Sequence, residues 1–273
     1  MSSIYGTLNS AMQALEAQQA AIETTSANIA NANTEGYSRR RPVFEEAAPN
    51  SDGTPGGVTL ARVEALRDNI TDLRIQAETQ QQSADDAISN ALQPVQLLFQ
   101  SGTNSIGDQL TSFFNSLQSL SADPADASVR QNVLTTASNL VSAFQSASQQ
   151  ISQTQTNLDL QVNQSVTSVN ALTAQIAELN TSIQTAQSEG RDASDLLDQR
   201  GQLLSSLSQS VDFSQFNDSE GVTLTTKDGT PLVIGGRSYQ LTTSQDANGH
   251  TLIYSGNTDI TSSLQGGSIG GAL

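Results

Sequence analysis

The first 30 residues carry an apolar pattern with a seven-residue period. Large aliphatic residues recur at every seventh position from residue 8 to residue 29, and another lies four positions before the first of them. A stripe this narrow is typical of a coiled-coil contact, whereas a helix that packs on a globular core has a wider one. The pattern alone also fits an ordinary amphipathic surface helix. We call this set the aliphatic seam, and its members are Ile4, Leu8, Leu15, Ile22 and Ile29.

Polar residues then predict the end of this helix. Asparagine is a poor residue for a helix interior because its amide competes for nearby backbone groups. Three of them, Asn28, Asn31 and Asn33, fall within six residues. Gly36 is free to take the positive φ that closes a helix. Tyr37 can anchor the departing chain with its ring while its hydroxyl is hydrogen-bonded.

Residues 38–65 lose the helical period, and we predict an extended linker there. Prolines and glycines punctuate the segment, and residues 58–63 alternate as one short strand. Three consecutive arginines, Arg39, Arg40 and Arg41, form the chain's one basic cluster. The cluster is either part of a solvated loop or a contact to an acidic neighbour.

Helical spacing returns over residues 66–212, and we predict an elongated α-helical domain. Its first helix spans residues 66–99, with Pro94 as a kink or break. Asp123 is expected to cap a later helix that has Pro124 at its first position.

The longest helix of this domain is predicted to follow Pro124. Neither proline nor glycine occurs from there to Gly190, and a continuous helix would approach about 95 Å. A break near residues 154–157 would divide it into two long helices. Gly190 is expected to end the helix, and Asp192 to cap the next one.

After residue 212 the period changes to two, which predicts a β domain over residues 213–265. The segments 222–225 and 232–234 are expected to be strands joined by a turn at residues 227–230. The fold class is therefore mainly α with a small antiparallel β domain (α+β), in which a coiled-coil-type helix over residues 1–37 precedes the long helical region.

Composition excludes several functions. The formal net charge of −16 disfavours binding to nucleic acid. There is no cysteine, and His250 is the single histidine, beside a turn. The acidic pair Asp195 and Asp198 most simply supports the start of a helix. We therefore predict no catalytic, cofactor or metal site and no enzyme activity. A hydrolase on a helical scaffold is the alternative from a different class.

Targeting signals are also missing from the sequence. The N-terminus lacks the basic and apolar regions of a secretory signal. No apolar run of eighteen residues could span a bilayer, so we predict no membrane insertion.

The first helix and its polar end resemble an element shared by the axial proteins of the bacterial flagellum, which has an ANxxNxxTxGY-like sequence. Glu35 replaces the proline of many members, which makes the turn less rigid. The continuation Ser38-Arg39-Arg40 and the later run 196–200 are most similar to the family of the hook–filament junction protein, the first hook-associated proteins. The matching residues of the element are Ala27, Asn28, Asn31, Thr34, Gly36 and Tyr37.

The resemblance implies a structural component of the flagellum that joins hook to filament by self-assembly into the axial tube. It implies that the aliphatic seam builds an inner coiled coil, and that Asn28, Asn31, Thr34, Gly36 and Tyr37 shape its exit. The implied partners are hook protein, other hook-associated proteins, copies of the same chain in an axial ring, and the flagellar export apparatus. The implied location is extracellular, reached without a cleaved signal peptide. The alternative is another axial protein of rod or hook type, although these lack the long helical block.

The resemblance also implies a return of the chain through the helical domain to a second amphipathic helix that pairs with the first. Residues 266–273 resemble the start of that return, so the likeness covers about the first half of a typical member. We therefore expect the aliphatic seam to have no partner within this chain and residues 1–37 to fray in the isolated monomer. The helical domain is expected to expose an apolar face.

Overall fold

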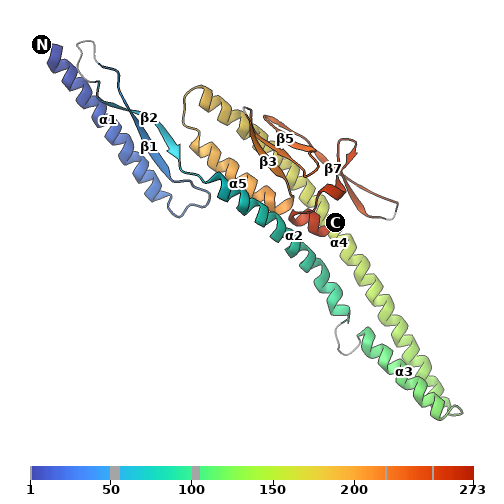
Figure 1. Ribbon diagram of the computed structural model, residues 1–273. Coiled ribbons are helices and arrows are strands. Elements are labelled where there is room, and N and C mark those ends of the chain that lie inside the picture. Colours follow the sequence, from blue (N-terminus) through green and yellow to red (C-terminus); the bar gives the residue numbers. More distant parts are fainter. Residues whose placement is uncertain (1, 50–55, 100–104, 219, 248) are drawn as a thin grey trace. The chain divides into compact units, whose positions relative to one another are not determined.

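The computed structural model describes residues 2–49, 56–99, 105–218, 220–247 and 249–273 (Figure 1). The chain forms two compact units. Unit 1 comprises Met1–Glu78, Asn170–Ser208 and Phe213–Gln240, and unit 2 comprises Thr79–Val169, Gln209–Asp212 and Leu241–Leu273. The five domains predicted from the sequence stay a prediction, and residues 50–55 of the predicted linker lie outside the described residues.

Unit 1 begins with a helix that lies along a β-hairpin (Figure 1). The helix α1 spans Ser2–Ala30, and the strands β1 (Arg40–Glu46) and β2 (Val58–Ala65) pair antiparallel with a register shift between Val43 and Phe44. The sequence analysis missed β1, because its proline and its four charged residues hide the strand pattern.

The buried face of α1 consists mostly of small residues. Ala17 and Thr24 are buried, and Gly6, Ser10 and Ala20 are half-buried. Small side chains let the hairpin backbone approach the helix closely. At Gly57, just before β2, φ is +87° and an added Cβ would lie 3.1–3.3 Å from Ser10.

The rest of unit 1 combines the last part of α4 (Ala127–Ser188), the helix α5 (Ser194–Ser210) and a four-stranded antiparallel sheet. The sheet order is β3-β4-β5-β6. Ile176 of α4, Leu207 of α5, and Leu224 and Leu232 of the sheet are fully buried, so the helices and the sheet share one core. The strands are β3 (Ser214–Asp218), β4 (Gly221–Thr225), β5 (Pro231–Ile234) and β6 (Arg237–Ser238).

A single buried amide joins α4 to this sheet. Asn180 Nδ2 donates to the carbonyl oxygens of Val222 and Gly235, both at 2.8 Å. Its Oδ1 accepts from the Val222 amide at 3.2 Å and from Arg200 of α5 at 2.8 Å. Asn180 is 1% exposed, and these four bonds satisfy its side chain completely.

Unit 2 is built on parts of α2 (Asn69–Phe99) and α4, with α3 (Ile106–Ala122) beside α4. Ser116 of α3 and Thr136 of α4 lie 2.8 Å apart. A three-stranded antiparallel sheet follows in the order β7-β8-β9, and Asp159 and Asn163 of α4 accept hydrogen bonds from its threonines. The remaining elements are β7 (Leu241–Gln245), β8 (Thr251–Ser255), β9 (Thr258–Asp259), the short 3-10 helix Thr261–Ser263 and α6 (Gly267–Ala272).

Several predicted helix boundaries are confirmed. Gly190 ends α4 with φ +70°, and the Ser194 amide donates to Asp192 at 2.9 Å at the start of α5. The helix α4 is continuous through residues 154–157, so its 62 residues extend over about 93 Å. The α+β fold class is correct.

The helix α2 continues through Pro94, so the break considered there does not occur, and a kink at this residue stays a prediction. One prediction was wrong. Asp123 does not cap α4. Its backbone N–H closes α3 by donating to the Ser119 carbonyl, while Asp126 accepts from the Ser128 amide at 2.6 Å and is the cap. Sequence spacing alone did not distinguish these two aspartates.

Candidate functional site

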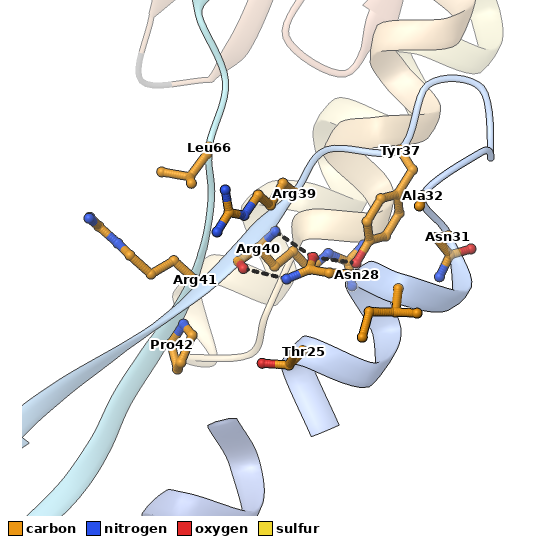
Figure 2. Close-up of a pocket in the computed structure, with 11 residues that line it drawn as sticks. Thr25, Asn28, Asn31, Ala32, Tyr37, Arg39, Arg40, Arg41, Pro42 and Leu66 are labelled. Carbon is orange, nitrogen blue, oxygen red and sulfur yellow. Dashed lines mark hydrogen bonds between the residues drawn. The ribbon is translucent and has the colours of Figure 1, made fainter. Parts of the chain in front are cut away.

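The polar end of α1 is organised by the side chain of Asn28 (Figure 2). Its Nδ2 donates to the Arg40 carbonyl oxygen at 2.8 Å, and its Oδ1 accepts from the Arg40 amide at 2.8 Å. The same Oδ1 accepts from the Tyr37 hydroxyl at 3.0 Å, which confirms that this hydroxyl is hydrogen-bonded. The Arg40 guanidinium lies over the Tyr37 ring, 5.0 Å from its centroid. Asn28 therefore ties the first residues of β1 back onto the helix.

The other residues of the element shape the turn itself. Asn31 Nδ2 donates to the Ala27 carbonyl at 3.0 Å, and the Thr34 hydroxyl donates to Asn31 Oδ1 at 3.2 Å. Gly36 has the predicted positive φ, +77°, but α1 has already ended at Ala30, so Gly36 shapes the turn after the helix and does not close it. The structure thus brings Asn28, Asn31, Thr34, Gly36 and Tyr37 together in one turn.

The aliphatic seam lies apart from this turn, along an exposed face of α1. Its five side chains are 58% to 72% exposed. Met12 and Tyr5 are also exposed. A run of large apolar residues open to solvent is typical of an interaction surface. The interaction roles of the seam and of the turn stay predictions.

A pocket of about 600 Å³ opens beside the turn (Figure 2). It is lined by Asn28 and Tyr37, by the three consecutive arginines, and by Leu66 among others. Arg39 is exposed, Arg41 pairs with Glu64 at 3.2 Å, and Arg40 is held by carboxylates of α5. Arg40 and Arg41 lie in β1 and pair with carboxylates of the same chain, so the cluster is not simply a solvated loop. A contact of the cluster to an acidic neighbour stays a prediction.

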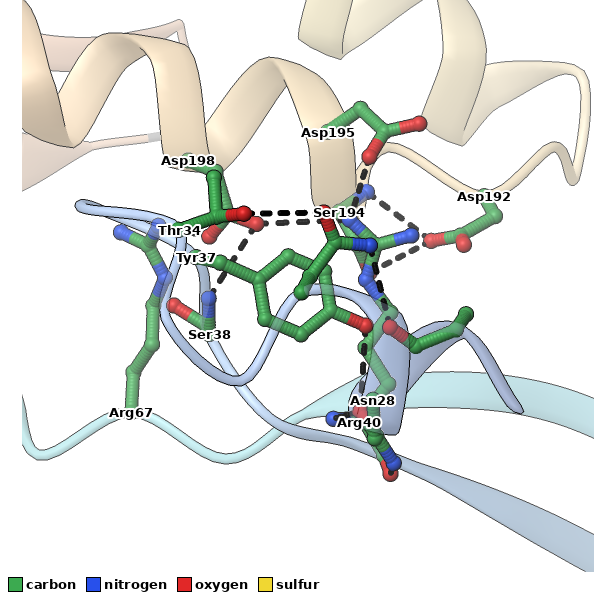
Figure 3. A network of polar contacts seen from close by, with 12 residues as sticks. Asn28, Thr34, Tyr37, Ser38, Arg40, Arg67, Asp192, Ser194, Asp195 and Asp198 are labelled. Atoms are coloured by element: carbon green, nitrogen blue, oxygen red, sulfur yellow. Dashed lines mark hydrogen bonds and ion pairs between the residues drawn. The ribbon is translucent and has the colours of Figure 1, made fainter. Parts of the chain in front are cut away.

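The carboxylates that hold Arg40 come from the first two turns of α5 (Figure 3). Asp198 accepts from the Ser38 amide and from Arg40, both at 3.3 Å, and also from Arg67. Asp195 accepts from Arg40 as well. We call Ser38, Arg40, Arg67, Asp195 and Asp198 the Asp198 cluster.

The two carboxylates of this cluster differ in how deeply they are buried. The Asp195 side chain is 79% exposed, whereas that of Asp198 is 9% exposed. Burial raises the pKa of Asp198, but the hydrogen bonds from Arg67 and Ser38 lower it, and the net pKa lies below its ordinary value. Asp198 is therefore a charged, nearly enclosed acceptor.

A second buried charge lies close by on α5. Burial, with a smaller contribution from Arg67, lowers the pKa of Arg200 to about 10. Arg200 donates to Asn180, the residue that joins α4 to the β3–β6 sheet. The helix α5 therefore contacts Asn180 through Arg200 and the start of β1 through Asp198.

The sequence analysis assigned Asp195 and Asp198 to the start of a helix, and for Asp198 this is wrong. Asp192 caps α5, and Asp198 binds residues that lie more than 130 positions earlier in the chain. No sequence signal pointed to this role, because the burial of Arg40 and Arg67, which requires a carboxylate partner, is visible only in the structure.

Features expected of an enzyme are sparse in the structure. Across the described residues, no three His, Cys, Asp or Glu side chains gather as a metal site would require. His250 lies in an exposed turn, where its Nδ1 is 3.1 Å from Asp246. Within the same described part of the chain, no helix is both long and apolar enough to cross a membrane.

Comparison with known proteins gives two family matches. Residues 92–273 match the model of the flagellar hook-associated protein FlgK helical domain. The chain belongs to the FlgK family of flagellar hook-associated proteins. Residues 8–37 also match the model of the flagella basal body rod protein, and that match ends at Tyr37, the last residue of the ANxxNxxTxGY-like sequence.

Individual FlgK relatives agree with this assignment. Flagellar hook-associated protein 1 of Bacillus subtilis is 33% identical over 84% of this chain, and that of Escherichia coli is 31% identical over 97%. The matches cover 48% and 51% of those proteins, so the chain spans about half the length of the curated relatives it matches. The solved flagellar hook junction protein FlgK from Burkholderia pseudomallei superimposes with a TM-score of 0.61 and 31% identity. That superposition covers 73% of this chain and 38% of the other.

Proposed function

We propose that this chain is a structural component of the bacterial flagellum that joins hook to filament by assembling into the axial tube. The observation that carries the proposal is the aliphatic seam of α1, in which five large side chains on one helix face are exposed. Their burial would contribute roughly 1.5–3 kcal/mol per side chain, enough to make the seam the main assembly contact.

The occupants of the seam are neighbouring subunits of the axial tube: hook protein, other hook-associated proteins and further copies of this chain. The turn formed by Asn28, Asn31, Thr34, Gly36 and Tyr37 fixes how the chain leaves that contact. The protein acts outside the cell, is delivered by the flagellar export apparatus without a cleaved signal peptide, and performs no catalysis. The match to the FlgK helical domain supports the junction role over a rod or hook role.

Leu15→Asp tests the proposal, because it places a charge at the middle of the seam on a side chain that is 70% exposed. We expect the variant to fold normally but to be absent from the hook–filament junction, with motility lost. Asn9→Asp is the matched control, since it adds the same charge to α1 at an exposed position outside the seam. Normal swimming of the Leu15→Asp strain would contradict the proposed function.

A further inference from the structure

The segment that carries α1, β1 and β2 is not held to the rest of unit 1 by a core of large side chains. Ala17 is the one apolar residue among the described residues of this segment that is buried. The segment is joined to α5 by polar contacts instead. Besides the Asp198 cluster, Gln202 donates to the Glu35 carbonyl oxygen at 2.8 Å. The orientation of the segment must therefore come from a few directional contacts.

These contacts meet at one carboxylate on α5. The chain enters the β1–β2 hairpin at Arg40 and leaves it after Ala65, and these two residues are opposite each other in the sheet. Ser38 and Arg40 lie on the entering side and Arg67 on the leaving side, and all three donate to Asp198 (Figure 3). One side chain thus binds both ends of the hairpin.

We propose that Asp198 is the positioning residue of the N-terminal segment, and that it sets the orientation of α1 and the aliphatic seam relative to α5. The importance of Asp198 for assembly rests on the proposed function. Its contacts with Ser38, Arg40 and Arg67 do not depend on that function. Asp198 is enclosed, and the Arg40 and Arg67 side chains are 13% and 22% exposed. Removing the carboxylate leaves two half-buried cations without their shared partner, which is far more costly than losing an exposed ion pair.

Two backbone amides that lie two residues apart provide the test. The Ser38 amide donates to Asp198, while the Arg40 amide donates to Asn28. In the full-length protein, Asp198→Ala should raise the hydrogen-exchange rate of the Ser38 amide about tenfold or more, the factor that corresponds to about 1.4 kcal/mol. The Arg40 amide should change less than about twofold, because its acceptor is intact.

Asp195→Ala is the matched control, since Asp195 also accepts from Arg40 but is exposed. It should leave the Ser38 amide within about twofold of the wild type. An unchanged Ser38 rate in Asp198→Ala, or an equal rise in Asp195→Ala, would overturn the proposal. A rise at every protected amide of unit 1, including that of Val222, would also overturn it, because Asp198 would then support the whole unit.

Incorporation at the hook–filament junction, measured in the same strains, separates this proposal from the proposed function. We expect Asp198→Ala to reduce incorporation and Asp195→Ala to retain it. Loss of Ser38 protection with full incorporation would refute a role of Asp198 in assembly. Normal incorporation of Leu15→Asp would instead refute the proposed function and leave the Ser38 result standing.

Discussion

The two faces of α1 differ in the size of their side chains and in their exposure. The face with small residues, such as Ala17, Ala20 and Thr24, lies against the hairpin, whereas the face with the large aliphatic residues is open to solvent. A helix that served only its own chain would be expected to bury its largest apolar side chains. This arrangement shows that the contact of α1 with the hairpin depends on close backbone approach, and it leaves the larger apolar area of the helix exposed.

The largest expected effect comes from placing the same charge on each face. Ala17→Asp buries a carboxylate against the hairpin and should destabilise the packing of α1 by about 3 kcal/mol or more. Leu15→Asp, two residues earlier, should change the stability of the isolated protein by less than about 0.5 kcal/mol. Urea unfolding of both variants measures the difference. Equal destabilisation would mean that the two faces are not distinct in the folded chain.

A smaller effect is expected at the turn, where the helix meets β1. Asn28→Ala removes three hydrogen bonds and leaves the Arg40 amide and carbonyl without their side-chain partner, so we expect a loss of about 2 kcal/mol. Asn31→Ala removes bonds only to nearby residues of the same turn and should lose about 1 kcal/mol. Urea unfolding again provides the measurement, and a larger loss for Asn31→Ala would refute this ranking.

The smallest effect concerns pH. The pKa of Asp198 is lowered in the folded chain from an ordinary value of 3.8, so its contribution to stability is fully present above that value. The contribution is lost as the pH falls from 3.8 through the lower pKa of the folded state, because protonation removes the charge that Arg40 and Arg67 require. The difference in melting temperature between wild type and Asp198→Asn should therefore be constant from pH 7 to pH 5 and shrink below pH 3.8. A difference in melting temperature that grew as the pH was lowered would contradict this prediction.

Local patterns predicted the parts of the fold that depend on local interactions. The end of α1, the positive φ of Gly36 and the bonded hydroxyl of Tyr37 follow from residue types within a few positions of one another. The absence of proline and glycine predicted the long helical region of α4, although it left open whether the helix is divided near residues 154–157. These features require no knowledge of distant residues.

The parts that the sequence analysis missed depend on distant pairing. The strand β1 forms because β2 pairs with it, although Pro42 and its flanking charges make it a poor strand by itself. Asp198 binds Arg40 across 158 positions, and no spacing rule connects the two. We expected residues 1–37 to fray because the aliphatic seam of their helix has no partner within this chain. That expectation did not include the β1–β2 hairpin, which contacts the other face of the helix. Amide exchange has yet to test that expectation.

The four hydrogen bonds of Asn180 restrict which residues can replace it. Asparagine and glutamine alone combine an amide that donates twice with a carbonyl oxygen that accepts, and glutamine is longer than this 1% exposed site allows. Aspartate would place a carboxylate against the carbonyl oxygens of Val222 and Gly235, and an apolar residue would leave Arg200 without its acceptor. No single substitution at Asn180 satisfies all of its partners, so sequence drift at this position would require compensating changes on α5 and in the sheet.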